Sequence, residues 1–454
     1  MLGNQTIREL SDAILERSQA DQTEVVLIAR DSALTRFANS TIHQNVAEKN
    51  PEVRIRVVIR DPGTHTGGRI GLASTNSLEE EALTRTLEKA VAMARLQPLN
   101  PDFVSLPAPQ PLPEADGFSQ STASCSPERR AQEAGAICRL ARDQGASAFG
   151  ALTTTVQELA VANSLGTFAY HRETTADINT VVMTDTGAGY ASALAQDLDL
   201  LDFEALGREA VDKCLRAQNP QPLEPGDYTV ILEPYAVQDL IQMFGYTGFS
   251  AVAVDEGRSF MSGRLGEQLM DPRISIWDDG LDPAGIPLPF DFEGVPKGRL
   301  DMIRNGVATG PLYNSYQAYK EGKTSTGHAL PLPSYIEALA LNAFFGPGDS
   351  SIQEMIAGTE RGLYITRFHY TRPVEPVKVV ITGMTRDGTF LVENGEIAQP
   401  VKNLRFTQSY VEALNHLEAI GRDAKLLIGF AGVARDSVPA LKLGGFTFTG
   451  TTEF

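Results

Sequence analysis

A proline-rich break near the middle of the chain constrains its fold more than any other feature. Residues 219–226 read Asn-Pro-Gln-Pro-Leu-Glu-Pro-Gly. Proline has no backbone N–H to donate, so this segment can neither continue a helix nor lie in a central strand. The chain has 454 residues, enough for more than one domain. We therefore predict an N-terminal domain over residues 1–220 and a C-terminal domain over residues 227–454.

Helices and strands are both predicted on each side of this break. Residues 53–57 alternate strictly between apolar and charged side chains, which is typical of a strand with one buried face. Apolar residues repeat at helical spacing over 83–94 and 237–244, and a further helix is predicted at Ser334–Phe345. The strands come in clusters that do not alternate regularly with helices. This order predicts an α+β fold, with a mixed α/β N-terminal domain and a β-rich C-terminal domain.

The net charge of −18 limits the partners of the protein. Nucleic acids and anionic lipid surfaces are bound through basic patches, so neither is an expected partner. The three cysteines show no Cys-x-x-Cys spacing, which fits a reducing compartment. No apolar run approaches the ~18 residues that a membrane span requires, and the first residues do not resemble a signal peptide. These features predict a cytoplasmic protein.

No local pattern predicts a metal site. Neither His-Glu-x-x-His nor His-Glu-x-x-x-His occurs, and none of the six histidines lies at metal-ligand spacing from another. His328 lies in a compact polar loop that could line a cavity, and His369 lies on a predicted strand. Both could meet Asp255 or Glu256 around a metal ion. Alternatively, they are ordinary hydrogen-bonded histidines of a loop and a strand.

Three short polar segments predict turns. Asp278-Asp279-Gly280 follows a predicted strand, and Asp387-Gly388 and Asn394-Gly395 flank residues 390–392. Asp-Gly and Asn-Gly favour the left-handed backbone conformations that hairpin turns need. The strand at 390–392 is therefore a candidate for an exposed strand with which an extended peptide could pair.

Several segments together resemble one known family. The chain is identified as a member of the TldD/TldE (PmbA) proteins on motifs that occur in the same order from about residue 7 to residue 450. The segments that carry the resemblance are Leu34–Asn45 (LTRFANSTIHQN), Ala162–Gly166 (ANSLG), Phe260–Gly263 (FMSG), Ser325–Ala329 (STGHA), Phe390–Glu396 (FLVENGE) and Phe446–Gly450 (FTFTG).

The resemblance implies a fold of the TldD/PmbA type whose C-terminal domain is metallopeptidase-like, and a protein that works in a pair. The TldD type carries His-Glu-x-x-x-His and a later cysteine as metal ligands and cleaves unfolded or extended peptides. The TldE type lacks the motif and pairs with TldD. In the register of the resemblance, the motif falls on Gln242, Met243 and Thr247, and the cysteine falls near Ala431. These side chains are poor zinc ligands, so the chain resembles the TldE type.

Three hypotheses follow. The first is a non-catalytic partner of a TldD-type peptidase that helps to hold an extended peptide, with zinc expected only in the partner and no catalytic residue in this chain. The second is an active hydrolase with a relocated site that includes His328, His369 and Glu256 as cavity-lining residues. The third is a homodimer that binds peptides without a catalytic partner.

Overall fold

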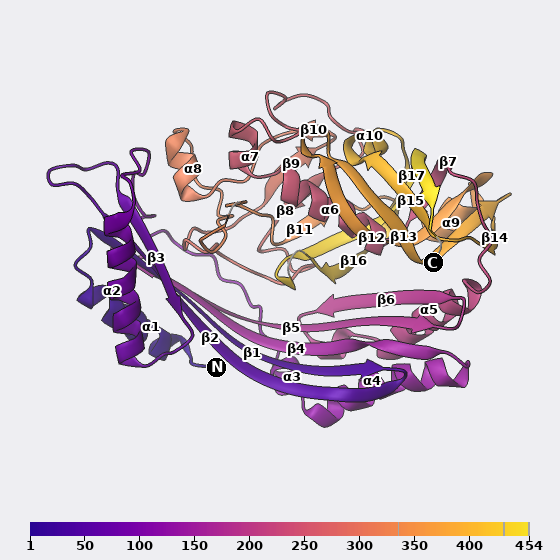
Figure 1. The fold of residues 1–454 in the computed structure, drawn as a ribbon, viewed down its shortest axis with the longest axis horizontal. Coiled ribbons are helices and arrows are strands. Elements are labelled where there is room, and N and C mark those ends of the chain that lie inside the picture. The colour runs from indigo at the N-terminus through magenta and orange to yellow at the C-terminus, as the bar shows by residue number, and fades with distance from the viewer. Residues whose placement is uncertain (335, 430–431, 453–454) are drawn as a thin grey trace.

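A computed structural model describes residues 1–454 except 335, 430–431 and 453–454. Its N-terminal half is built on one antiparallel sheet with the order β3-β2-β1-β4-β5-β6. The long strands curve beneath the C-terminal half (Figure 1). The strands are β1 (Gln22–Ala38), β2 (Thr41–Ile59), β3 (Arg69–Thr75), β4 (Ser147–Asn163), β5 (Phe168–Met183) and β6 (Ala188–Ala195).

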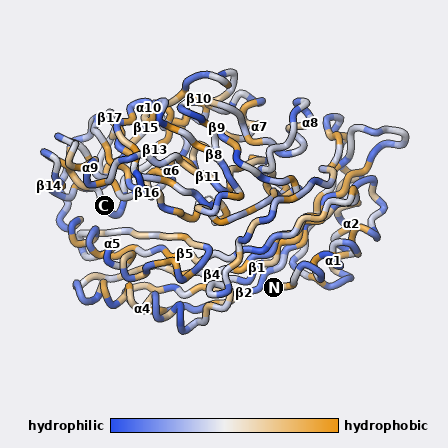
Figure 2. Tube along the Cα trace, turned by 180° about the vertical axis from the view of Figure 1, so that it is seen from behind, coloured by the Kyte–Doolittle hydropathy of each residue, from blue (hydrophilic) through white to orange (hydrophobic). Residues whose placement is uncertain are grey.

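Helices cover one face of this sheet. The side chains of Val25 and Leu27 on β1 pack against apolar residues of α1 and α2, and Phe37 at the end of β1 packs with residues of α4 and α5. Because side chains alternate along a strand, the intervening residues of β1 point to the opposite, concave face. Hydropathy changes from residue to residue along these strands, as expected when the two faces differ (Figure 2). The helices are α1 (Asn4–Arg17), α2 (Glu80–Leu96), α3 (Gln120–Ala123), α4 (Pro127–Asp143) and α5 (Phe203–Arg216).

The C-terminal half is built on an 11-stranded sheet that includes both parallel and antiparallel pairs. Helix α6 (Pro234–Thr247) lies against this sheet, and its Val237, Leu240 and Phe244 belong to the largest apolar core. The strands are β7 (Gly226–Leu232), β8 (Ile276–Asp278), β9 (Leu300–Arg304), β10 (Val307–Ala308), β11 (Ala343–Phe345), β12 (Arg361–Glu375), β13 (Val380–Glu393), β14 (Glu396–Pro400), β15 (Leu404–Ser409), β16 (Leu417–Ile428) and β17 (Arg435–Thr451). Short helices complete this half: α7 (Ala251–Asp255), α8 (Ser315–Lys320), α9 (Ile352–Ala357) and α10 (Tyr410–Asn415).

The content and arrangement of these elements confirm the α+β class. The first sheet ends with β6 and the second begins with β7, so the proline-rich segment 219–226 lies between them. The domain boundaries 1–220 and 227–454 stay a prediction. No helix in the described part of the chain combines the length and the apolar character that a membrane crossing requires.

The helix predicted at Ser334–Phe345 is wrong. Among the described residues of this range, which exclude 335, the structure has only the short strand β11. Leu339 and Leu341 pack with apolar residues of the first sheet, whereas Ala338 and Ala340 belong to the core of the C-terminal half. Successive residues therefore face opposite partners, which requires an extended chain with a period of two rather than a helix.

The interpretation of residues 387–395 is partly wrong. Asn394-Gly395 forms the turn between β13 and β14 as predicted, but Asp387-Gly388 lies within β13. Phe390 pairs with Tyr364 of β12 on one side and with Pro400 of β14 on the other. This stretch is therefore not an exposed edge. Its apolar sequence reflects a strand buried between two neighbours.

Candidate functional site

A groove of about 500 Å³ lies between the concave face of the first sheet and loops of the C-terminal half. At one end of this face, apolar residues such as Val26 and Val161 pack against Phe290 and Leu339 and join the two halves. Further along the same strands the side chains become polar and line the groove. The sheet supplies Arg30, Ser32, Thr155, Glu173 and Asp177, and Arg435 comes from the opposite side.

Strand register determines how these polar side chains line up. Arg30 of β1 is paired with Gln157 of β4, and Gln157 is paired with Glu173 of β5. Four residues further along β5, Asp177 is paired with Thr153 on one side and Leu194 on the other. Four strand residues span about 13 Å, so the floor of the groove is a ladder of polar rows long enough to contact several residues of an extended peptide.

The first of these rows connects the sheet to the C-terminal half. The Arg30 guanidinium donates two hydrogen bonds to Gln157 Oε1, at 3.1 and 2.7 Å. Gln157 Nε2 donates to Glu173 Oε1 at 3.0 Å, and Glu173 forms an ion pair with Arg435 at the start of β17. Glu173 and Arg435 are both buried. Glu173 and Arg435 therefore neutralise each other's charge within the protein, although Glu173 Oε2 and Arg435 Nε have no hydrogen-bond partner among the described residues.

Asp177 differs from that row because it forms no ion pair with the described residues. Its buried Oδ1 atom has no hydrogen-bond partner in the part of the chain that the structure describes. Burial raises the pKa of Asp177 to about 6, and the hydrogen bond from Asn179 offsets this only in part. No nearby cation lowers this pKa, as expected for a carboxyl group without an ionic partner.

Helix α6 carries the positions that the resemblance aligns with the metal-binding motif. Gln242 and Met243 are partly buried, and Thr247 is buried. Thr247 Oγ1 donates a hydrogen bond to the Met243 carbonyl at 2.7 Å, inside the helix. The fourth position, Ala431, lies outside the described residues.

One turn earlier on α6, Gln238 binds the segment that borders the groove. Gln238 Nε2 donates to the carbonyl of Ile428 at 2.8 Å and to Asp436 Oδ2 at 3.2 Å. Burial raises the pKa of Asp436 to about 7, and the bond from Gln238 only partly offsets this. Gln238 thus connects α6 to a carbonyl and a carboxyl group of the segment that borders the groove.

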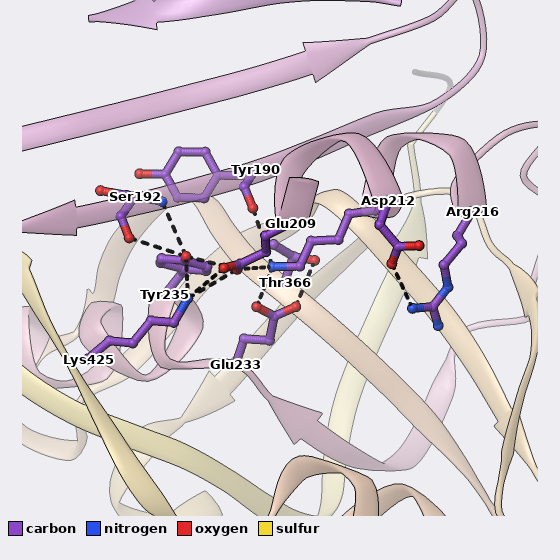
Figure 3. Close-up of polar contacts among 10 residues, drawn as sticks. Tyr190, Ser192, Glu209, Asp212, Arg216, Glu233, Tyr235, Thr366 and Lys425 are labelled. Carbon is purple, nitrogen blue, oxygen red and sulfur yellow. Dashed lines mark hydrogen bonds and ion pairs between the residues drawn. The ribbon is translucent and has the colours of Figure 1, made fainter. Parts of the chain in front are cut away.

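The N-terminal end of α6 is held by a buried charge network that spans both halves of the molecule (Figure 3). Lys213 of α5 donates to Glu233, the N-cap residue of α6, at 2.6 Å and to Glu209 at 2.7 Å. Lys425 of β16 donates to Glu209 at 2.8 Å and to the hydroxyl of Tyr235 at 2.8 Å. Although burial opposes it, the two carboxylates raise the pKa of Lys213, so the lysine stays charged. This network fixes α6 against the N-terminal half.

His328 does not line a cavity. Its side chain is 0% exposed, and Nε2 lies 3.1 Å from Asp278 Oδ1. Lys297 Nζ lies 2.8 Å from the same oxygen, and the Asp278 side chain is also 0% exposed. Burial lowers the pKa of His328, which Asp278 only partly counteracts. The sequence predicted only a turn at Asp278–Gly280. In the structure, Asp278 is the last residue of β8 and the centre of this cluster.

His369 and Glu256 lie in other surroundings. His369 is on β12, next to the ring of Tyr370, and burial together with Arg386 and Arg367 lowers its pKa. Glu256 is exposed and pairs with Arg258 at 2.5 Å. The structure therefore gives His328, His369 and Glu256 different partners. Across the described ranges, no group of three or more His, Cys, Asp or Glu side chains is placed to hold a metal ion.

The side chains at the α6 positions aligned with the metal-binding motif do not fit a zinc ion. Zinc in proteins is bound by imidazole, thiolate or carboxylate groups. Gln242, Met243 and Thr247 offer an amide, a thioether and a hydroxyl that is already bonded within the helix. We therefore derive no chemical step through a metal in this chain.

Comparison with known families agrees with the motifs. The PmbA/TldA metallopeptidase domain 1 matches residues 23–94, the central domain matches residues 124–218, and the C-terminal domain matches residues 225–450. The chain belongs to this family. Its fold is similar to that of TldE from Thermococcus kodakarensis, with a TM-score of 0.85, 22% identity and coverage of 98% of this chain and 99% of the other.

Curated relatives in the PmbA/TldD family carry peptidase names. "Metalloprotease PmbA" of Escherichia coli O157:H7 is 26% identical over 377 residues, which is 78% of this chain and 79% of the relative. A "Metalloprotease" of Methanothermobacter thermautotrophicus is 28% identical over 244 residues, or 53% of each chain. The chain spans only 53% of the length of this relative, and 61% and 55% of the lengths of two relatives from Methanocaldococcus jannaschii.

Sequence reasoning did not identify Asp177, Glu173 or Arg435 as site residues. A signal was present in β5, where Glu173, Thr175, Asp177 and Asn179 alternate with apolar residues. Such alternation usually indicates a face in water. Only the structure shows that the polar face is covered by the C-terminal half.

Proposed function

We propose that this chain is the TldE/PmbA-like, non-catalytic subunit of a TldD/TldE-type metallopeptidase in the cytoplasm that degrades extended peptides. One observation carries the proposal: the α6 positions aligned with the metal-binding motif hold Gln242, Met243 and Thr247. The loss involves the motif's glutamate as well as its histidines. This chain therefore lacks both the ligands for a zinc ion that would bind the attacking water and the glutamate that would act as its general base.

In this proposal the chain contributes the groove and its partner contributes the zinc. The polar rows of the concave sheet offer hydrogen-bonding side chains over a length suited to an extended peptide. The charge network at the N-terminal end of α6 and the row from Arg30 to Arg435 tie the two walls of the groove together. A peptide would therefore meet a preformed surface, and binding would not have to order the walls first.

The alternative of a relocated hydrolase site has little support. His328 would have to contact substrate, yet its side chain is fully enclosed beside Asp278 and Lys297.

The alternative of a peptide-binding homodimer is separated from the main proposal by one experiment. The purified chain, a TldD-type relative from the same organism and their mixture are assayed with an unstructured peptide in the presence of zinc.

The proposal expects no cleavage by this chain alone and faster cleavage by the mixture than by the relative alone. Chelation of zinc should stop the reaction of the mixture. Chelator-sensitive cleavage by the chain alone would show that it is itself an enzyme. No effect of the chain on its relative, together with binding of the intact peptide, would favour the homodimer.

A further inference from the structure

Asp177 is a partly buried acid of the groove that lacks an ionic partner among the described residues. The other groove carboxylates are paired: Glu52 contacts Arg54 at 2.8 Å, and Glu173 contacts Arg435. The Asp177 side chain lines the same groove, and its buried Oδ1 atom has no hydrogen-bond partner among the described residues.

Two acids outside the groove have hydrogen-bond or ionic partners within the protein. Asp239 of α6 accepts hydrogen bonds from Thr371 and Tyr410, both at 2.6 Å. Asp278 lies beside Lys297 and also accepts the backbone N–H of Asn342 at 2.7 Å. A buried carboxylate oxygen without a donor costs free energy. Glu173 Oε2 also lacks a donor, but the Glu173 charge is paired with Arg435. Asp177 is therefore the groove carboxylate for which a ligand would supply the missing partner.

The neighbours of Asp177 limit what that donor can be. Thr153 and Leu194 flank it on β4 and β6, and neither brings a charge. The strongest partner for a carboxylate in such a place is a cationic N–H donor. The net charge of −18 would also draw cationic peptides toward the protein.

We propose that Asp177 binds a positively charged group of the extended peptide, either a Lys or Arg side chain or the free N-terminal ammonium. This inference rests on the proposed function, because it assumes that the groove holds a peptide. It adds a preference for cationic peptides and assigns that preference to one residue of the non-catalytic subunit.

The test measures binding of fluorescently labelled peptides to the full-length chain by anisotropy. Four unstructured peptides share one apolar and polar sequence and carry the label at the C-terminus. They differ in having Lys or Gln at one internal position and a free or acetylated N-terminus. The two singly cationic peptides distinguish the two sources of charge. We expect one of them to bind at least about tenfold more tightly than the uncharged peptide, the scale of a hydrogen bond to a charged group.

Asp177→Asn should remove that preference, so that the ratio between the affinities for the singly cationic and the uncharged peptide falls to about one. Asp143→Asn, at the exposed C-terminal end of α4, is the matched control with the same change in net charge, and it should keep the preference. Equal affinities for all four peptides, or a preference that survives in Asp177→Asn, would overturn the inference and leave the proposed function intact. Failure of every peptide to bind would overturn both. Circular dichroism establishes that each variant is folded.

Discussion

The Asp177 carboxyl on the groove floor and the carboxyl groups near helix α6 are bonded in different ways. Around α6, Glu233 and Asp239 are bonded to lysine, threonine and tyrosine side chains. On the groove floor, Asp177 retains a buried carboxylate oxygen with no such partner in the described structure. A fully bonded region serves to hold its elements in place, whereas a region with an unmatched polar group is suited to receive a ligand. Under the proposed function, the first sheet therefore binds the peptide and α6 holds the two halves in place.

The largest expected effect comes from breaking the network that holds α6. Lys213→Met leaves Glu233 and Glu209 near each other without their shared cation, and we expect a loss of about 3–5 kcal/mol in unfolding free energy. Denaturation in urea, followed by circular dichroism, measures this. Asp212→Ala removes the partner of Arg216 on the exposed side of the same helix and should cost less than about 1 kcal/mol. Similar losses for the two variants would contradict the view of α6 as a tightly held scaffold.

Glu173→Gln should weaken the connection between the groove floor and the C-terminal half. Arg435 would lose its ionic partner in a buried place, at a cost of about 2 kcal/mol. The same urea experiment measures the loss, with Glu48→Gln on the exposed part of β2 as control. If Glu173→Gln is as stable as the control, the row from Arg30 to Arg435 does not join the two walls.

His328→Gln tests whether the enclosed histidine has a chemical role. We expect a loss of about 1–2 kcal/mol because Asp278 loses a neighbouring donor in a buried place. Peptide cleavage by the mixture with a TldD-type partner should be unchanged at temperatures where the variant is folded. Loss of cleavage in a variant of wild-type stability would instead support the relocated hydrolase.

The smallest expected effect is a gain in stability from Asp177→Asn. The pKa of Asp177 is raised to about 6 in the folded protein, so folding favours the protonated form. Stability from this group is therefore present at pH 4 and is lost as the pH rises through 6. The neutral asparagine avoids this loss, so we expect a gain on the order of 1 kcal/mol at pH 7 that disappears near pH 4. A loss of stability at pH 7 would show that the carboxylate has a partner within the protein.

The sequence predicted the scaffold better than the site. Apolar spacing located α6 because its buried face is continuous in the sequence. The same reasoning placed a helix at Ser334–Phe345, where an extended segment packs against two different parts of the molecule. Asp177 could not be found because the residues that line the groove with it come from distant parts of the chain, such as Arg435, and no local pattern records that approach. The positions on α6 were found only through the family resemblance.

The most direct test of the account is the zinc content of the purified chain after dialysis against a weak chelator, measured by elemental analysis. The account predicts a value near zero per chain, because Gln242, Met243 and Thr247 do not supply zinc ligands. A TldD-type relative treated in the same way serves as the positive control. A value near one zinc per chain would contradict the account and would mean that the chain carries a metal centre of its own.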